Sequence, residues 1–276
     1  MTALRVFHCS DLHFGHPAVP EQYEALEAHI REHRYDVVAI SGDLSQRARA
    51  GEFQRARVFI QNAERSGSKV IVVPGNHDVA WWFSPLGLGA DRQLLKKYRQ
   101  YISDDIEPVL RMPGATFVGV NTSHGITPRT LTWNLRDLSI IGYVRDAQLA
   151  RAAAEFEKAP AGDARVLVLH HNAVKGELSR RHGLRNTDRV HAAIQDMRVD
   201  LVLCGHDHQE AVQAIEHPTK RTTVSTAGTI SNRGRGGRPS SANSIRLTPE
   251  SIDVQTLIWS ADARAFVDGP RQCFNR

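Results

Sequence analysis

Residues 70–79 read VIVVPGNHDV, and this stretch is the centre of the pattern that predicts the fold. Four apolar residues run into a Pro-Gly pair, which predicts a short buried strand ending in a sharp turn. Asn76, His77 and Asp78 follow directly. Open α/β sheets bind their ligands at the carboxyl ends of strands, so an amide, an imidazole and a carboxylate stand at an expected site. The same three residues would also suit a turn with no chemical role.

The same pattern, an apolar run followed by polar side chains, occurs at four other predicted strands. These strands are LRVFHC (4–9), DVVAIS (36–41), RVLVL (165–169) and VDLVLC (199–204). The polar residues that follow them are Asp11 and His13, Asp43, His170 and His171, and His206 and His208. Amphipathic helical patterns over 21–34, 52–66, 145–158 and 187–197 alternate with the strands. Right-handed helical crossovers bring the ends of parallel strands to one edge, so these polar groups are expected to converge.

The composition is that of an ordinary globular protein, with 41% of its 276 residues hydrophobic and 24% charged. The net charge is +5, and only six of the 35 basic residues are lysine. Arginine suits bidentate contact with phosphate, so an anionic substrate fits, although a solvated basic surface without a specific partner is the simpler explanation of the charge. The three cysteines are scattered, which argues against a disulfide framework.

The chain shows no division into domains and no membrane-directing segment. No apolar run approaches the roughly 20 residues of a spanning helix, and the first residues lack a secretory signal pattern, so a cytoplasmic protein without a transmembrane segment is expected. A single domain over 1–276 is expected, with an insertion at about 79–113 beside the site. Trp81, Trp82 and Phe83 in this insertion either anchor it or form an apolar wall that contacts substrate.

Eight side chains at the predicted strand ends offer nitrogen or oxygen atoms to a metal or a substrate. They are Asp11, His13, Asp43, Asn76, His77, His170, His206 and His208. One zinc-like ion needs fewer ligands, and the absence of cysteine argues against a structural zinc site. The set suits two divalent or trivalent ions about 3.5–4 Å apart that share one carboxylate. Imidazole and carboxylate ligands are compatible with manganese, iron or zinc.

The chain resembles the calcineurin-like metallophosphoesterases in five segments that span residues 11–208. The segments are Asp11-x-His13, Gly42-Asp43, Gly75-Asn76-His77-Asp78, His170 and Gly205-His206-x-His208. The arrangement is most similar to the bacterial branch that holds cyclic-nucleotide and glycerophosphodiester phosphodiesterases. The resemblance implies an α/β fold in which a two-sheet β-sandwich is flanked by helices, giving four layers (α/β/β/α).

The resemblance also implies roles for the residues of these segments. One metal ion would be held by Asp11, His13, Asp43 and His208, and the other by Asp43, Asn76, His170 and His206. Asp43 is then the bridge between the ions, and His171 lies behind the ligands. His77 is expected to be catalytic, giving a proton to the leaving alkoxide or holding a phosphate oxygen. Asp78 is expected to keep the His77 ring oriented and protonated.

The predicted function is hydrolysis of a phosphodiester by metal-bound hydroxide, on a small soluble substrate such as a cyclic nucleotide or glycerophosphodiester. Four alternatives use the same residues: a pyrophosphate hydrolase acting on a nucleotide-linked lipid, a nuclease, a phosphomonoesterase, and a metal-binding scaffold without catalysis. No dedicated nucleic-acid-binding module is visible, and the sequence does not indicate an oligomeric state.

Two basic segments are interpreted as loops, one mobile over 175–186 and one flexible over 232–243. Arg180, Arg181 and Arg185 in the first are either phosphate contacts or part of a solvated surface.

Overall fold

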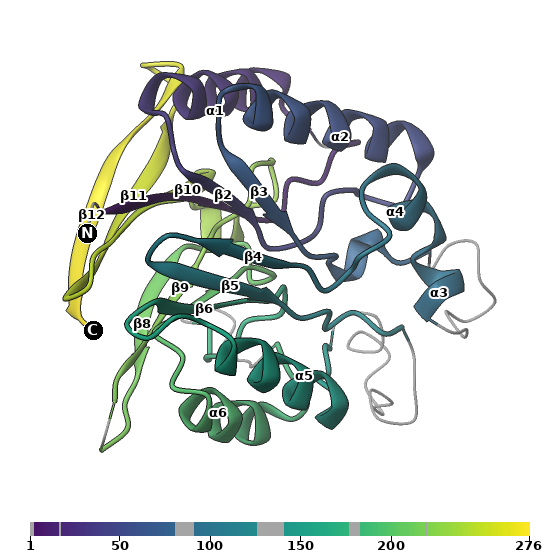
Figure 1. Ribbon diagram of the computed structural model, residues 1–276. Coiled ribbons are helices and arrows are strands. Elements are labelled where there is room, and N and C mark those ends of the chain that lie inside the picture. Colours follow the sequence, from purple (N-terminus) through teal and green to yellow (C-terminus); the bar gives the residue numbers. More distant parts are fainter. Residues whose placement is uncertain (1–2, 17, 81–90, 126–140, 177–182, 219) are drawn as a thin grey trace.

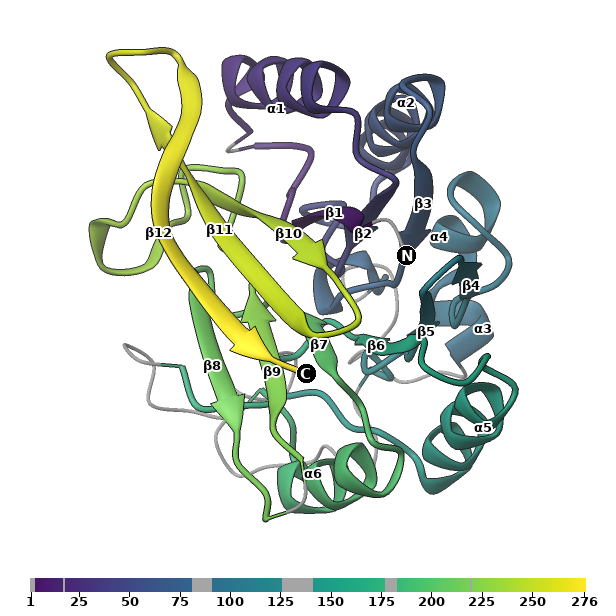
Figure 2. The ribbon, with the colours of Figure 1, turned by 60° about the vertical axis from the view of Figure 1, so that its left-hand side comes forward.

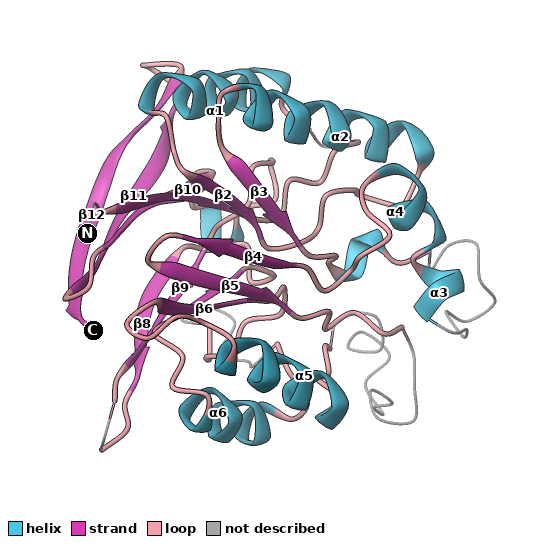
Figure 3. Ribbon diagram, in the orientation of Figure 1, coloured by secondary structure: helices cyan, strands magenta, loops and turns pink. Residues whose placement is uncertain are grey.

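The computed structural model describes residues 3–16, 18–80, 91–125, 141–176, 183–218 and 220–276. Two six-stranded sheets face one another, and helices cover the outer side of each sheet (Figures 1 and 3). The predicted α/β fold, a two-sheet sandwich flanked by helices, is confirmed. In the described parts of the chain, no helix has the length and apolar character needed to cross a membrane.

The first sheet is built around the amino-terminal strand. Its strands, in spatial order, are β12 (Ala265–Asn275), β11 (Ser251–Ser260), β10 (Ser241–Leu247), β1 (Leu4–Cys9), β2 (Val37–Ile40) and β3 (Lys69–Val72). β1, β2 and β3 run parallel, whereas β10, β11 and β12 are antiparallel to their neighbours. The outer side of this sheet is covered by α1 (Pro20–His33), α2 (Ala50–Arg65) and α4 (Lys96–Tyr101).

The second sheet repeats the pattern with a different strand order. Its strands are β4 (Val109–Met112), β5 (Ala115–Gly119), β6 (Ala164–Val168), β7 (Leu201–Cys204), β9 (Thr222–Thr226) and β8 (Ala211–Ile215). β5, β6, β7 and β9 are parallel, and the edge strands β4 and β8 are antiparallel. The outer side is covered by α5 (Asp146–Glu157) and α6 (Thr187–Asp196). The short α3 (Asp91–Leu94) and two 3-10 turns, η1 (Asn76–Asp78) and η4 (Arg235–Gly237), lie in the connections.

Three apolar cores hold these layers together, and β1 shows how a single strand supplies two of them. Leu4 and Val6 lie in the core between the sheets, while Phe7 and Cys9 lie in the core beneath the helices. Successive side chains of a strand point to opposite faces, so a strand that is apolar at every position is buried on both faces. The third core joins the second sheet to α5 and α6.

His8 is a buried polar residue of β1, and it lies inside the sandwich. Its Nε2 is 2.9 Å from Ser41 Oγ, and its Nδ1 is 3.4 Å from Ser225 Oγ on β9 of the opposite sheet. Complete burial lowers the pKa of His8 to about 3. The ring is therefore a neutral hydrogen-bonded link between the sheets.

Several local predictions differ from the structure. The stretch at 79–113 contains β4, a regular strand of the second sheet, after the expected helical part (α3 and α4). Residues 241–243, predicted as part of a flexible loop, begin β10 and pair with β11. Trp81, Trp82 and Phe83, and also Arg180 and Arg181, lie outside the described residues.

Candidate metal centre

Seven side chains meet at the carboxyl ends of five strands, and we call them the strand-end cluster. They are Asp11, His13, Asp43, Asn76, His170, His206 and His208. Asp11 and His13 follow β1, Asp43 follows β2 and Asn76 follows β3, all from the first sheet. The three remaining histidines follow β6 and β7 of the second sheet. The cluster therefore closes one rim of the sandwich, and the convergence predicted from the sequence is present.

The first half of the strand-end cluster contains two histidines and two carboxylates. His13 Nε2 and His208 Nε2 are 3.0 Å apart. Asp11 Oδ1 is 3.1 Å from His208 Nε2, and Asp43 Oδ2 is 3.7 Å from His13 Nε2. Ligands about 2.1 Å from one ion at right angles stand roughly 3 Å from each other, so these four atoms have the spacing of a shared ion.

The second half of the strand-end cluster has the same spacing around an amide oxygen. Asn76 Oδ1 is 3.0 Å from His170 Nε2 and 3.1 Å from His206 Nδ1. Asp43 Oδ1 is 3.5 Å from His170 Nε2. Because Oδ2 of Asp43 faces the first half, its carboxylate lies between the two halves. His171, which sits in a possible metal-holding group with His170 and His206, has its Nδ1 2.6 Å from Thr122 Oγ1.

Burial and charge prepare the strand-end cluster for cations. Burial lowers the pKa values of His13 and His206 well below the usual range, so both rings are neutral and able to bind a metal. Burial opposes ionisation of Asp11, yet the nearby His208 and His13 rings hold its pKa well below normal. Burial, together with the negative charges of Asp11 and Asp78, raises the pKa of Asp43. A cation between these carboxylates would relieve that repulsion.

Unsatisfied atoms give a second test of fit to metal ions. Asp11 Oδ1 and His13 Nδ1 are buried without a hydrogen-bond partner among the described residues. The Nε2 atoms of His13 and His208 also face each other directly, 3.0 Å apart. Buried polar groups normally have partners, and exceptions point to a bound ion or water. The residues therefore fit a metal centre that uses nitrogen and oxygen ligands.

Backbone strain is concentrated in the strand-end cluster. Of its seven residues, five have positive φ values: Asp11 (53°), His13 (46°), Asp43 (52°), His206 (72°) and His208 (54°). Aspartate and histidine tolerate this left-handed region better than most residues, but each position still costs energy. Strain at one place that the surrounding fold maintains is typical of a functional site.

Two glycines of the sequence motifs are needed because other atoms approach them closely. A Cβ at Gly75 would overlap Asp43 Oδ1, and a Cβ at Gly205 would overlap Ser10 Oγ and Asp11 Oδ2. Any side chain at either position would displace a carboxylate of the strand-end cluster. The glycines therefore fix how close the carboxylates come to the neighbouring turns.

Asp78 has a different partner from the one that the sequence suggested. Its Oδ1 accepts from Ser45 N and Ser45 Oγ, both at 2.8 Å, and its Oδ2 accepts from Leu44 N at 3.1 Å and Gly75 N at 2.9 Å. All of these donors belong to the turns after β2 and β3, and none belongs to the His77 ring. The expectation that Asp78 orients His77 is wrong, because η1 directs the carboxylate back into the β2 turn. Asp78 instead joins the turns that carry Asp43 and Asn76.

His77 is held by residues that the sequence did not single out. Its Nδ1 donates to the main-chain oxygen of Gln46 at 2.8 Å, and its Nε2 is 3.5 Å from Arg233 Nη1. Burial, with a further contribution from the Arg233 charge, lowers the pKa of His77 to about 4. At neutral pH the ring thus keeps its proton on Nδ1 and a lone pair on Nε2. Arg233 lies in a segment predicted to be flexible, and no local motif distinguishes it.

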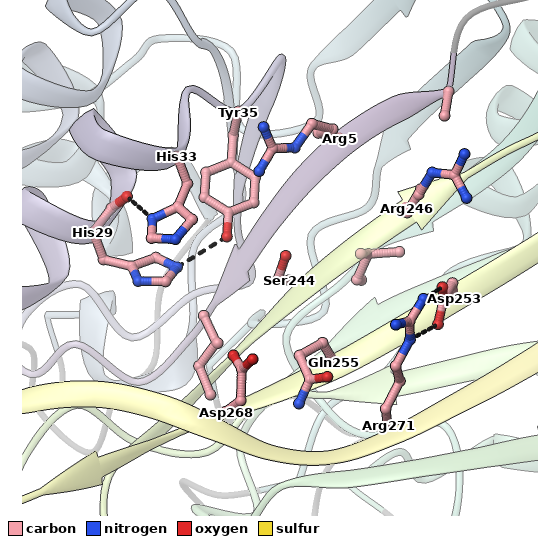
Figure 4. A pocket seen from close by; sticks show the side chains of 13 residues that line it. Arg5, His29, His33, Tyr35, Ser244, Arg246, Asp253, Gln255, Asp268 and Arg271 are labelled. Atoms are coloured by element: carbon pink, nitrogen blue, oxygen red, sulfur yellow. Dashed lines mark hydrogen bonds and ion pairs between the residues drawn. The ribbon is translucent and has the colours of Figure 1, made fainter.

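A separate cavity, of about 520 Å³, lies on the outer side of the first sheet (Figure 4). We call it the outer-face cavity, and its lining residues are Ala3, Arg5, His29, His33, Tyr35, Ser244, Ile245, Arg246, Asp253, Gln255, Leu257, Asp268 and Arg271. β1 passes from this cavity at Arg5 towards the strand-end cluster at its other end. Figure 2 shows the β10–β12 strands that form its floor.

Comparison with protein families matches most of the chain. The model for calcineurin-like phosphoesterases matches residues 4–210. Among curated proteins, the chain is similar to the DNA double-strand break repair protein Mre11 of Methanopyrus kandleri, with 28% identity over 182 residues. That match covers 60% of this chain and 37% of the relative, so the chain spans little more than a third of that protein.

Solved structures share the fold at low sequence identity. Purple acid phosphatase PPD1 from yellow lupin (Lupinus luteus) seeds has a TM-score of 0.66 and 10% identity, covering 100% of this chain and 54% of that one. GAP50, described as the anchor in the inner membrane complex of Plasmodium, has a TM-score of 0.58 and 14% identity, covering 94% and 85%. At these identities the likeness establishes the architecture alone.

Proposed function

The chain belongs to the calcineurin-like phosphoesterase family, and on that premise we propose that it hydrolyses phosphodiesters at a two-metal centre. The observation that supports this best is the position of Asp43, whose two carboxylate oxygens face the two halves of the strand-end cluster at 3.5 and 3.7 Å. One carboxylate shared between two sets of ligands is the arrangement that a pair of ions requires.

We assign the ligands by these distances. Asp11, His13 and His208 would hold one ion with Asp43 Oδ2, and Asn76, His170 and His206 would hold the other with Asp43 Oδ1. When bound, two manganese, iron or zinc ions would align the phosphate and lower the pKa of a water that attacks phosphorus. Asp78 keeps the halves in register by joining the turns that carry Asp43 and Asn76.

His77 is proposed as the group that serves the leaving oxygen. Gln46 occupies its Nδ1, so Nε2 is the nitrogen that can reach the substrate. The negative charge of a bound phosphate favours protonation of this ring, and the protonated Nε2 then gives its proton to the departing alkoxide. General acid catalysis of this kind contributes roughly 10²–10⁴-fold to the rate.

The proposed substrate is a small soluble diester, such as a cyclic nucleotide or a glycerophosphodiester, as in the bacterial branch that the motifs resemble. We further propose one domain over 1–276, with an insertion at about 79–113 beside the site, and a cytoplasmic location. A nucleotide-linked lipid, a phosphomonoester and a scaffold without turnover remain the outcomes against which the diester is tested. DNA is a second candidate substrate, because the curated relative is named a DNA double-strand break repair protein.

The test is hydrolysis of bis(p-nitrophenyl) phosphate against p-nitrophenyl phosphate by metal-stripped protein, before and after addition of Mn²⁺ or Fe²⁺. Metal-dependent turnover that favours the diester is the expected result. Preference for the monoester would replace the proposal with a phosphatase, and cleavage of plasmid DNA faster than of the small diester would replace it with a nuclease. Two bound ions with no turnover of any phosphoester would support the scaffold.

A further inference from the structure

The segment between β9 and β10 carries three arginines, and two of them have acidic partners. Arg235 Nε is 3.6 Å from Asp207 Oδ1, and Arg238 Nη1 is 3.1 Å from Glu210 Oε1. Both acidic residues lie just after β7, in the connection that also supplies two histidines of the strand-end cluster. These pairs attach the arginine segment to the rim of the site.

Arg233 differs from the other two in its surroundings. Among the described residues, no carboxylate lies within ion-pair distance of its guanidinium. Its Nη1 donates to Gln46 Oε1 at 3.0 Å and lies 3.5 Å from His77 Nε2. A half-buried cation thus stands beside the catalytic candidate, with neutral groups as its partners.

The main chain of the same residue is fixed to the strand-end cluster. His208 Nδ1 donates to the carbonyl oxygen of Arg233 at 3.1 Å, and Arg235 N donates to the carbonyl oxygen of His208 at 3.1 Å. A hydrogen bond to the second ring nitrogen orients a metal-binding histidine. The segment therefore sets the position of the His208 ring and of the Arg233 side chain together.

We infer that Arg233 binds a non-bridging oxygen of the substrate's phosphoryl group, next to the oxygen that His77 serves. This inference rests on the proposed function. A positive charge beside two expected metal ions is unfavourable unless an anion binds among them. The guanidinium presents a planar set of donors that matches phosphate, and it stays charged at any working pH. Arg233 thus places a fixed positive charge beside His77, and this charge favours anionic phosphoryl groups over neutral esters.

The experiment compares Arg233→Gln and Arg233→Lys with the wild type in the manganese-loaded protein. Bound metal, inhibition by inorganic phosphate, and kcat and KM for bis(p-nitrophenyl) phosphate are measured for each. Loss of one preorganised donor costs roughly 10²–10³-fold in turnover, so that fall in kcat/KM is expected for Arg233→Gln, with weaker phosphate inhibition. Arg233→Lys should recover part of both, because it keeps the charge but not the fork.

Two controls separate a phosphate contact from a structural effect. Arg238→Gln, which removes an anchor of the same segment, should keep phosphate inhibition within a few fold of wild type. Guanidinium ion added to Arg233→Ala should restore turnover, which a misfolded segment would not show. Loss of bound metal in Arg233→Gln, or unchanged phosphate inhibition, would overturn the inference.

The same measurements distinguish this inference from the proposed function. Phosphate binding to the metal-loaded protein can be measured by calorimetry even if no phosphoester is hydrolysed. A wild type that binds phosphate through Arg233 without turnover would contradict the proposed function alone. An active wild type with an unaffected Arg233→Gln would contradict the inference alone.

Discussion

The strand-end cluster and the outer-face cavity are both polar, both involve β1, and differ in how their polar groups are satisfied. In the outer-face cavity, Arg271 donates through Nε to Asp253 Oδ1 at 2.9 Å and through Nη2 to Asp253 Oδ2, and His29 Nε2 lies 3.0 Å from the Tyr35 hydroxyl (Figure 4). The Arg5 guanidinium lies over the Tyr35 ring, 5.3 Å from its centre. These side chains pair their charges and hydrogen-bonding groups with one another, so no ligand is needed.

In the strand-end cluster, by contrast, His13 Nδ1 is buried without a hydrogen-bond partner among the described residues, and the Nε2 atoms of His13 and His208 face each other. Five residues of the strand-end cluster hold strained backbone conformations, whereas the strands beneath the outer-face cavity keep mostly regular register. Convergence of nitrogen and oxygen ligand atoms held in strained backbone therefore identifies the functional site better than the volume of a cavity. The following variants test this difference, from the largest expected effect to the smallest.

Replacing Asp43 with Asn should have the largest effect, because one carboxylate serves both halves of the strand-end cluster. We expect both metal affinities to fall by at least about 100-fold and turnover to disappear. Asp253→Asn, in the outer-face cavity, is the matched control and should keep both ions. Metal analysis after dialysis measures the outcome, and full occupancy in Asp43→Asn would remove the bridging assignment.

Replacing His77 with Gln should lower turnover while leaving metal content unchanged. The expected loss is roughly 10²–10⁴-fold for a diester with an alkyl leaving group, which needs a proton. With a p-nitrophenyl leaving group the loss should be smaller. His29→Gln removes a histidine from the outer-face cavity and should leave both rates as they are. Loss of a metal ion from His77→Gln would show that His77 is a ligand.

Removing the metals should destabilise the protein, because the strained residues of the strand-end cluster then lose the ions that they would bind. Each ion stabilises the native state by about 2.7 kcal/mol when free metal is 100 times its Kd. The Tm should therefore rise with added Mn²⁺ in the wild type. In Asp43→Asn it should not rise, and a wild-type Tm independent of metal would contradict the proposed centre.

His8, between the two regions on β1, should make the metal-free protein sensitive to acid. Its pKa is about 3 in the folded protein and near 6.5 when unfolded, so below pH 6.5 the unfolded chain binds the extra proton. The free energy of unfolding is therefore unaffected by His8 above pH 6.5. It decreases as the pH is lowered, by about 2 kcal/mol between pH 6.5 and 5. Urea unfolding of wild type and His8→Gln at both pH values should show a smaller difference for the variant. Equal differences would assign the acid sensitivity to other groups.

Breaking the Arg271–Asp253 pair with Arg271→Gln should have the smallest effect on the metal centre. The Arg271 side chain is largely exposed and lies in the outer-face cavity, so metal content and turnover should match the wild type. A change in turnover would show that the outer-face cavity communicates with the strand-end cluster.

The strand-end cluster could be predicted because its signal is both local and topological. Each ligand candidate follows an apolar strand directly, and parallel strands with helical crossovers bring those ends together. Arg233 could not be found in this way. Its place beside His77 comes from tertiary contacts, with Gln46 through its side chain and with His208 through its carbonyl oxygen, and such contacts leave no periodic pattern in the sequence.

Two other features were missed for related reasons. The partner of Asp78 depends on the direction of one turn, which adjacency in sequence does not reveal. β12 contains Gly269 and Pro270, which resemble a turn, but an edge strand tolerates proline because its outer N–H groups need no partner.

The position of β1 in the first sheet has a consequence for synthesis of the chain. β1 pairs on one side with β2, which follows soon after, and on the other with β10, where Leu4 meets Leu247. Until the ribosome has released β10, one edge of β1 has unpaired main-chain groups. The apolar side chains on its inner face also remain exposed until the second sheet has been made. Such long-range pairing slows folding and prolongs exposure to aggregation. The nascent chain therefore gains its central strand pairing after the last histidine of the metal centre has already been made.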